Sequence, residues 1–186
     1  MTESEFENMF DNLMKRRRNE MKSQYNRVLP SGEYIYNRFS KAEDLNCGKK
    51  TSIYDTSVVM GDVEIGENVW VGPYTILEGI NGKLKIGDYV SIDAGVMIYT
   101  HDTTKSYLSG GMNPVEKSDV EIGSNTVIGT MTTIKCGVKI GNHCVIGAHS
   151  YVNKDVPDGY IAAGIPAKII GEVIINADGT VDFKYY

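Results

Sequence analysis

The chain has 186 residues, enough for one main domain, and its formal net charge of -5 argues against nucleic acid as a partner. Its three cysteines form no Cys-x-x-Cys pair, and their odd number argues against a disulfide framework and favours a reducing compartment. The N-terminus is acidic, without the apolar core of a signal peptide, and no apolar run approaches the ~20 residues of a membrane span. We therefore expect a cytoplasmic protein.

Residues 1–48 predict a helical cap. Apolar side chains between residues 6 and 28 recur three or four positions apart, as they do on one face of an amphipathic helix, and Pro30 ends the pattern. A second short helix is expected within residues 32–46. These helices should cover the open end of the domain that follows, because exposed strand edges need protection. The basic run at 15–18 indicates a solvated helix face or, alternatively, a basic rim for a phosphorylated ligand.

From residue 53 onwards, an apolar residue recurs at every sixth position. The clearest run is Ile128, Ile134, Ile140 and Ile146. Six is not a helical period, because neighbours on one helix face lie three or four residues apart. The period slips by three residues at "EGINGK", residues 78–83, and a long inserted loop interrupts it at 102–119.

These six-residue units predict an all-β fold, a parallel β-solenoid over residues 49–171. Each unit forms one short strand and a turn, so that three units close a triangular coil of about 18 residues. The apolar residue points into the triangle, and the coils stack about 4.8 Å apart through strand pairing. The final residues, 172–186, hold two β-rich runs around "NADG". They predict a hairpin extension or, alternatively, a strand that pairs with a neighbouring subunit.

The frame resembles the hexapeptide repeat of the left-handed parallel β-helix. Three further motifs accompany it: "THD" at 100–102, "NKD" at 153–155 and "AAGIPAK" at 162–168. Together they are similar to the acetyl-CoA-dependent O-acetyltransferases of the maltose and galactoside type, and to relatives that decorate bacterial surface polysaccharides. The resemblance implies a homotrimer with active sites in the grooves between neighbouring solenoids. Acetyl-CoA would run along one groove, and the acceptor would enter from its other end.

Acetyl transfer to a hydroxyl requires a general base, a donor for the oxyanion and a rigid groove. His101 is the candidate base, because it stands where the regular frame ends and a histidine has an unperturbed pKa near 6.5. The resemblance assigns the base to this histidine; the alternative is a corner histidine without a role. His101 would be oriented by Asp102, by Glu116 or by a backbone carbonyl, and the sequence leaves these alternatives open.

The resemblance also implies the residues that hold the donor. The backbone N–H of Thr130, with Gly129 beside it, corresponds to the oxyanion donor. The positions that correspond to the coenzyme A site are Thr130, Ala148, Asn153, Lys154 and Lys168. Lysines at such positions meet phosphates as point charges, and their alternative is an ordinary surface role.

The acceptor site departs from the resembled enzymes, because "LEGINGK" replaces the region that carries their acceptor-binding residues. We take Glu78, Asn81 and Asp102 as candidate acceptor contacts. The first hypothesis is O-acetylation of a sugar hydroxyl in surface polysaccharide biosynthesis. The alternative is N-acetylation of a nucleotide-linked amino sugar.

Two other histidines, His143 and His149, occupy outward positions six residues apart, on different sides of the triangle. With His101 they make three, the number of histidines in a γ-type carbonic anhydrase zinc site that crosses a subunit boundary. Such an enzyme, or a purely structural hexapeptide subunit, is the remote alternative. We expect no metal.

Overall fold

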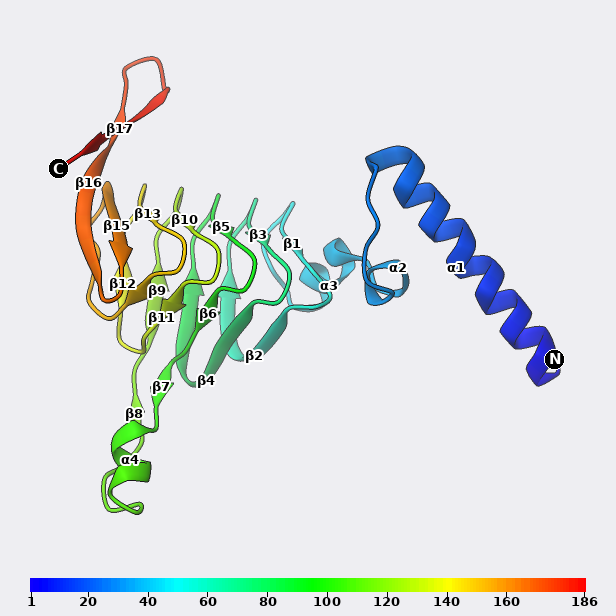
Figure 1. Ribbon diagram of the computed structural model, residues 1–186, viewed down its shortest axis with the longest axis horizontal. Helices are drawn as coiled ribbons and strands as arrows, with labels where there is room; N and C mark the ends of the chain where they lie inside the picture. The colour runs from blue at the N-terminus through cyan, green and yellow to red at the C-terminus, as the bar shows by residue number, and fades with distance from the viewer.

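In the computed structural model, which describes residues 1–186, the chain is a triangular β-solenoid with a helix at one end and a hairpin at the other (Figure 1). Side A stacks β1 (Ser52–Ile53), β3 (Trp70–Val71), β5 (Ser91–Ile92), β10 (Val127–Ile128), β13 (Val145–Ile146) and β15 (Tyr160–Gly164). Side B stacks the first parts of β2 (Val58–Ile65) and β4 (Ile76–Ile86) with β6 (Met97–Ile98), β11 (Thr133–Ile134) and β14 (Tyr151–Val152). Side C stacks the second parts of β2 and β4 with β9 (Val120–Ile122) and β12 (Lys139–Ile140). Strands within each stack pair in parallel.

The core is a column of apolar side chains inside the triangle, one from each side of each coil. Ile128, Ile134 and Ile146 are 0%, 0% and 1% exposed, and the other residues at this position of the repeat are also buried, apart from the partly buried Val59 near the first coil. Each fully buried side chain of this size contributes about 1.5–3 kcal/mol to folding. The six-residue period therefore predicts both the strands and the core, and the predicted β-solenoid is confirmed.

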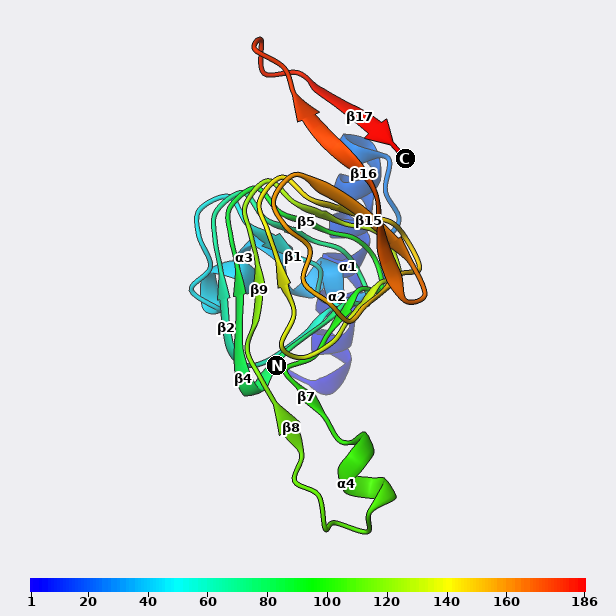
Figure 2. The same ribbon diagram turned by 90° about the vertical axis from the view of Figure 1, so that its left-hand side faces the viewer.

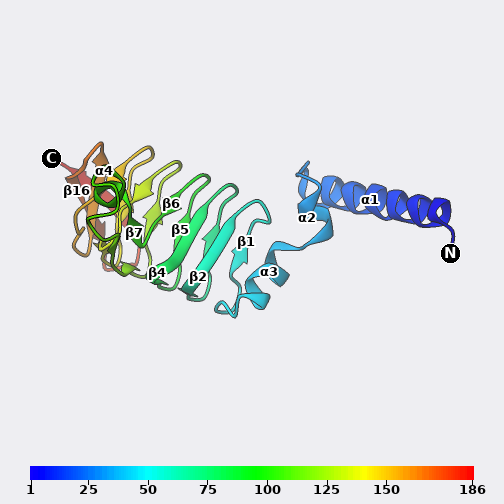
Figure 3. The same cartoon turned by 90° about the horizontal axis from the view of Figure 1, so that it is seen from below.

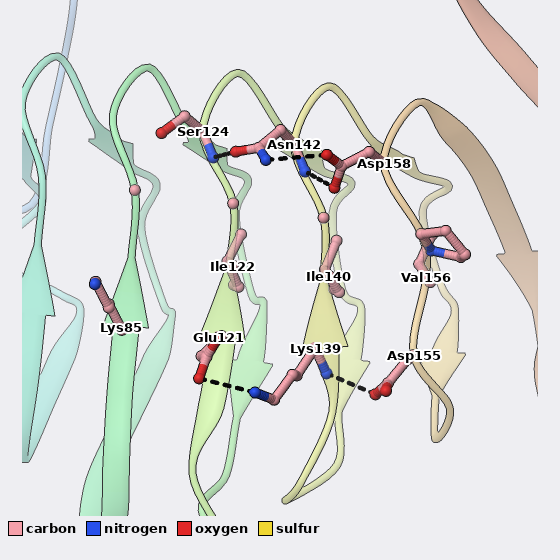
Figure 4. A pocket seen from close by; sticks show the side chains of 14 residues that line it. Lys85, Glu121, Ile122, Ser124, Lys139, Ile140, Asn142, Asp155, Val156 and Asp158 are labelled. Atoms are coloured by element: carbon pink, nitrogen blue, oxygen red, sulfur yellow. Dashed lines mark hydrogen bonds and ion pairs between the residues drawn. The ribbon is translucent and has the colours of Figure 1, made fainter.

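The corner between sides C and A is held by a ladder of side chains, seen from close by in Figure 4. Each acceptor receives the backbone N–H of the residue one coil below: Asp88 from Glu67, Ser124 from Asp88, Asn142 from Ser124 and Asp158 from Asn142. The glycine before each step is required, because a Cβ on Gly123 would lie 2.5 Å from a backbone carbon of Gly141.

The N-terminal helices behave differently from one another. α3 (Arg38–Asp44) lies against β1 and covers the first coil, whereas α1 (Glu3–Tyr25) projects away from the solenoid (Figures 1 and 3). Only Met14 of α1 is buried. The helix expected within 32–46 is divided into α2 (Gly32–Ile35) and α3, because Asn37 caps α3 by accepting the N–H of Phe39. Neither α1 nor any other helix combines the length and apolarity that crossing a membrane requires.

The C-terminal segment forms the expected hairpin. β16 (Ala167–Ile175) pairs with β15 and with β17 (Val181–Tyr185), both antiparallel. Gly179 closes the turn with a φ of 83°, a conformation that favours glycine. The hairpin begins within this chain's own last coil, at Ala167, so its first strand pairs without a neighbouring subunit.

We predict that Ile134→Ala lowers the free energy of unfolding by about 2–5 kcal/mol, because it removes a fully buried side chain and leaves a cavity. Ile175→Ala is the matched control, since that side chain is 50% exposed, and it should change stability by less than about 0.5 kcal/mol. Denaturant unfolding of both variants measures the difference. Equal losses would contradict the assignment of the core.

Candidate active site

The candidate base lies at the root of the inserted loop. The chain leaves side B after β6, forms β7 (His101–Asp102), α4 (Thr104–Leu108) and β8 (Glu116–Lys117), and returns at β9. Figure 2 shows this loop projecting away from the coils. The slip in the six-residue period lies in β4, one coil below, and the N–H of Asn81 donates to Thr100 Oγ1 at 3.3 Å. The two irregularities of the repeat therefore meet at one corner, between sides B and C.

Glu78 lies beneath His101 at this corner. Its side chain is 2% exposed, and its Oε2 is 2.9 Å from Nδ1 of His101. The same oxygen accepts the N–H and the hydroxyl of Thr100, at 2.9 and 3.0 Å, and Oε1 accepts the N–H of Ile80 at 2.6 Å. Burial by itself would raise the pKa of Glu78, but the hydrogen bonds from Thr100, His101 and Ile80 outweigh it and hold that pKa below the ordinary value.

This placement contradicts the expectation that Glu78 contacts the acceptor. The carboxylate is enclosed by protein donors and does not face open space, so a sugar cannot reach it directly. Asn81 remains beside the loop root, half-buried, and its role in acceptor binding stays a prediction.

His101 presents one free ring nitrogen. Its side chain is 28% exposed, and Tyr99 meets the imidazole edge-on with the ring centroids 6.2 Å apart. Because Nδ1 faces Glu78, Nε2 points from the other edge of the ring and has no partner in the chain. A free, oriented imidazole nitrogen is what proton abstraction from a substrate requires.

An ion-pair network holds the stem of the loop. Lys135, from the next coil, lies 3.3 Å from Asp102 and 3.8 Å from Glu116, and Lys105 also pairs with Glu116. Hydrogen bonds from Thr104, followed by Lys135, lower the pKa of Asp102 to about 2. Asp102 and Glu116 therefore hold the loop, and Glu78 is the group that contacts His101. No sequence motif contains Lys135; the pattern shows only that it directly follows the buried Ile134.

The predicted oxyanion donor lies at the other end of side B. Thr130 and Gly129 follow β10 at the corner between sides A and B. The Gly129 N–H is taken by the carbonyl of Ile146 at 2.8 Å, whereas the Thr130 N–H has no partner in the chain. β11 separates the corner at Thr130 from the corner at His101, so the two lie at opposite ends of side B. One chain therefore does not bring this N–H and His101 to the same carbonyl.

The five residues predicted to bind coenzyme A fall into two groups. Ala148 stacks one coil above Gly129, where a Cβ on that glycine would lie 2.6 Å from the Ala148 nitrogen. Lys168 pairs with Ala163 at the end of side A, so Thr130, Ala148 and Lys168 share one corner. Asn153 and Lys154 follow β14, at the corner of His101.

His143 and His149 stand apart from His101 and from each other. His143 lies at the corner of sides C and A, and His149 at the corner of sides A and B, both with positive φ. The chain contains no group of three or more His, Cys, Asp or Glu side chains that is arranged to hold a metal ion.

A groove along side C is lined by charged side chains from successive coils (Figure 4). Lys85, Glu121, Lys139 and Asp155 occupy equivalent places on successive coils. Lys139 Nζ lies 3.1 Å from Glu121, and the Lys139 N–H donates to Asp155 at 2.8 Å. Lys139, Glu121 and Asp155 are thus linked to one another. The groove contains neither His101 nor its partners.

The family model described as bacterial transferase hexapeptide (six repeats) matches residues 119–154. The galactoside O-acetyltransferase of Escherichia coli K12 is 34% identical over 146 residues, which cover 66% of this chain and 69% of that protein. The chain spans between 48% and 70% of the lengths of three curated relatives that it matches.

Two solved structures are similar. A hexapeptide-repeat acetyltransferase of Vibrio cholerae, in complex with acetyl coenzyme A, has a TM-score of 0.65 and 24% identity over 87% of each chain. AntD, an N-acyltransferase of Bacillus cereus in complex with dTDP and 3-hydroxybutyryl-CoA, has a TM-score of 0.61 and 25% identity over 67% of this chain and 70% of its own. The fold expected from the repeat, a left-handed β-helix of hexapeptides, is confirmed.

We predict that the Asp102 carboxyl titrates near pH 2, below its ordinary value of 3.8. Because the folded pKa is depressed, the stability that this carboxylate gives the stem is present above the ordinary value and is lost as the pH falls through 2. Lys135→Met should raise the midpoint only part of the way to 3.8, since the Thr104 hydrogen bonds remain. Carbon-13 NMR of the side-chain carboxyl measures it, with Lys154→Met as the control. A full return to the ordinary value in Lys135→Met would contradict the order of causes.

Proposed function

The chain belongs to the hexapeptide-repeat acetyltransferases, and on this premise we propose that it transfers the acetyl group of acetyl-CoA to a sugar hydroxyl, with His101 as general base. The acceptor is a precursor of a surface polysaccharide. The observation that carries the proposal is the anchored imidazole at the loop root, whose Nε2 is free. The name of the galactoside O-acetyltransferase relative supports a sugar hydroxyl as acceptor.

The reaction is an acyl transfer in two steps. Nε2 of His101 takes the proton of the acceptor hydroxyl while its oxygen attacks the thioester carbonyl carbon. The carbonyl oxygen becomes an oxyanion, which the unpaired N–H of Thr130 stabilises. The carbon–sulfur bond then breaks, the thiolate of coenzyme A takes the proton from the imidazolium, and the acetyl ester remains on the sugar.

We further propose that two chains of a homotrimer build each site. Thr130 and His101 of one chain lie at opposite ends of side B, with β11 between them, so they do not act on one carbonyl. A neighbouring solenoid would place its own Thr130 corner opposite His101. Ala148 and Lys168 of that neighbour would line the path of coenzyme A, while Asn153 and Lys154 would approach it from the His101 side.

N-acetylation of a nucleotide-linked amino sugar is a second candidate. The likeness to an N-acyltransferase in complex with dTDP favours it. An amine that is already deprotonated in solution needs less help from a base than a hydroxyl does. The two candidates are distinguished by offering matched hydroxyl and amino sugars, with and without a nucleotide, and measuring the release of free thiol from acetyl-CoA.

We predict that His101→Ala lowers kcat on a hydroxyl acceptor by about 10²–10⁴-fold, the range of general-base contributions. The affinity for acetyl-CoA should change little, because His101 acts on the acceptor in the transition state. Thiol release under saturating acetyl-CoA measures kcat, and calorimetry measures binding. His143→Ala and His149→Ala are the controls and should stay within a few-fold of the original chain.

A near-normal kcat of His101→Ala on a hydroxyl acceptor would remove the proposed base. Retention of activity on an amino sugar alone would instead support the N-acetyltransferase. A loss at His143 or His149 as large as that at His101 would place the site elsewhere.

Hybrid trimers test whether the site is shared between chains. His101→Ala chains lack the base, and Ala148→Trp chains carry a bulky ring in the donor groove at an exposed position. If equal amounts of the two chains mix at random, about three quarters of the trimers contain both chains, and each of these has one intact site out of three. We therefore predict recovery of about a quarter of the original rate. If the mixture is as inactive as its components, the site lies within one chain. Mixing with the His101→Ala/Ala148→Trp double variant is the control, and it should restore nothing.

A further inference from the structure

We propose that Glu78 is a positioning residue, whose buried carboxylate fixes His101 with a proton on Nδ1 and balances the charge of the imidazolium when Nε2 accepts a proton. This inference rests on the proposed role of His101. Glu78 lies outside the motifs "THD", "NKD" and "AAGIPAK". It does not touch the reacting atoms, so its effect on the reaction passes through the histidine.

The hydrogen bonds around Glu78 determine the tautomer of His101. An ionised carboxylate can only accept hydrogen bonds, and Oε2 already accepts the N–H and hydroxyl of Thr100. The imidazole nitrogen 2.9 Å away must therefore donate, which puts the proton on Nδ1. In the neutral ring, the lone pair is then on Nε2, the nitrogen that faces away from Glu78. This is the form that a general base needs.

The position of Glu78 is set by the fold and not by a ligand. Thr100 Oγ1 donates to Glu78 and accepts the N–H of Asn81, so one hydroxyl joins the loop root to the coil below. Next to Glu78, Gly79 presses against β2 so closely that a Cβ would lie 2.2 Å from the carbonyl oxygen of Asp62. The carboxylate is thus held before any substrate arrives, which is the condition for preorganised electrostatics.

His101 is also the only possible counter-charge for this carboxylate. No lysine or arginine lies within ion-pair distance of Glu78. A buried charge without partners is costly, and in the resting state the hydrogen bonds from Thr100, Ile80 and His101 offset that cost for Glu78. When His101 takes the acceptor's proton, a buried ion pair forms at the moment at which positive charge appears on the ring. The arrangement therefore favours the transition state over the ground state.

Glu78→Gln tests the charge while keeping the shape. The amide oxygen can still accept from Thr100 and His101, whereas the amide nitrogen then faces the Ile80 N–H, which loses its acceptor. We expect kcat to fall about 10- to 100-fold, the worth of a hydrogen bond to a charged group, and the KM for acetyl-CoA to stay within about twofold. Glu78→Asp keeps the charge and should recover part of the loss. Glu116→Gln is the control, because it removes a carboxylate from the loop stem without touching His101.

Nitrogen-15 NMR of the histidine rings gives a readout that does not depend on turnover. In the original chain, neutral His101 should show a protonated Nδ1 and an unprotonated Nε2. A proton on Nε2 would overturn the proposal even if Glu78→Gln failed to fold. A large loss of kcat in His101→Ala with none in Glu78→Gln would contradict only this inference, whereas a normal kcat in His101→Ala would contradict the proposed function itself.

Discussion

The inward stacking of one apolar side chain from every six residues is the constraint on which the rest of this structure depends. Each coil is only three short strands, and none of them would be stable alone. Stability comes from columns of isoleucine and valine that pass through the centre of all coils, together with parallel pairing between coils. Because this packing tolerates little variation, the two departures from the six-residue period meet at one corner of the triangle, where they form the candidate active site.

The six-residue period predicted the core and the strands of the coils, and the two β-rich runs around "NADG" predicted the C-terminal hairpin. The repeat also allows the proximity of Glu78 to His101 to be predicted. Leu77 pairs with Ile98, because one coil plus the three-residue slip separates them in the sequence. The residue after Leu77 therefore lies beneath the start of the loop. What the pattern could not show is that a glutamate at this place turns inward, since glutamate is almost never fully buried without a partner. Only the four donors around it make that placement possible.

For the N-terminal helix, the sequence predicts the element but not its packing. Its amphipathic pattern predicts a helix but does not say which surface its apolar face would meet, and α1 projects away from the coils that it was expected to cover. A third limit of sequence-based prediction concerns the donor corner, the corner between sides A and B that carries Thr130 and Gly129. The sequence motifs assign Thr130 and His101 to one site, but the structure places them at opposite ends of side B in a single chain.

The loop root and the donor corner thus have complementary properties. The first carries an oriented base on a preformed carboxylate, with its loop held by Lys135. The second carries an N–H without a partner beside a closely packed glycine. Neither is a complete site for acyl transfer, and each has what the other lacks. This is the physical reason for expecting neighbouring chains to meet along side B.

A crystal structure with a non-transferable thioether analogue of acetyl-CoA tests this account most directly. We expect the carbonyl oxygen of the analogue within hydrogen-bond distance of the Thr130 N–H of one chain, and His101 Nε2 of a neighbouring chain facing the same carbonyl carbon across the space for one hydroxyl. An analogue bound along side C, or a carbonyl group distant from every His101 in the assembly, would contradict the account.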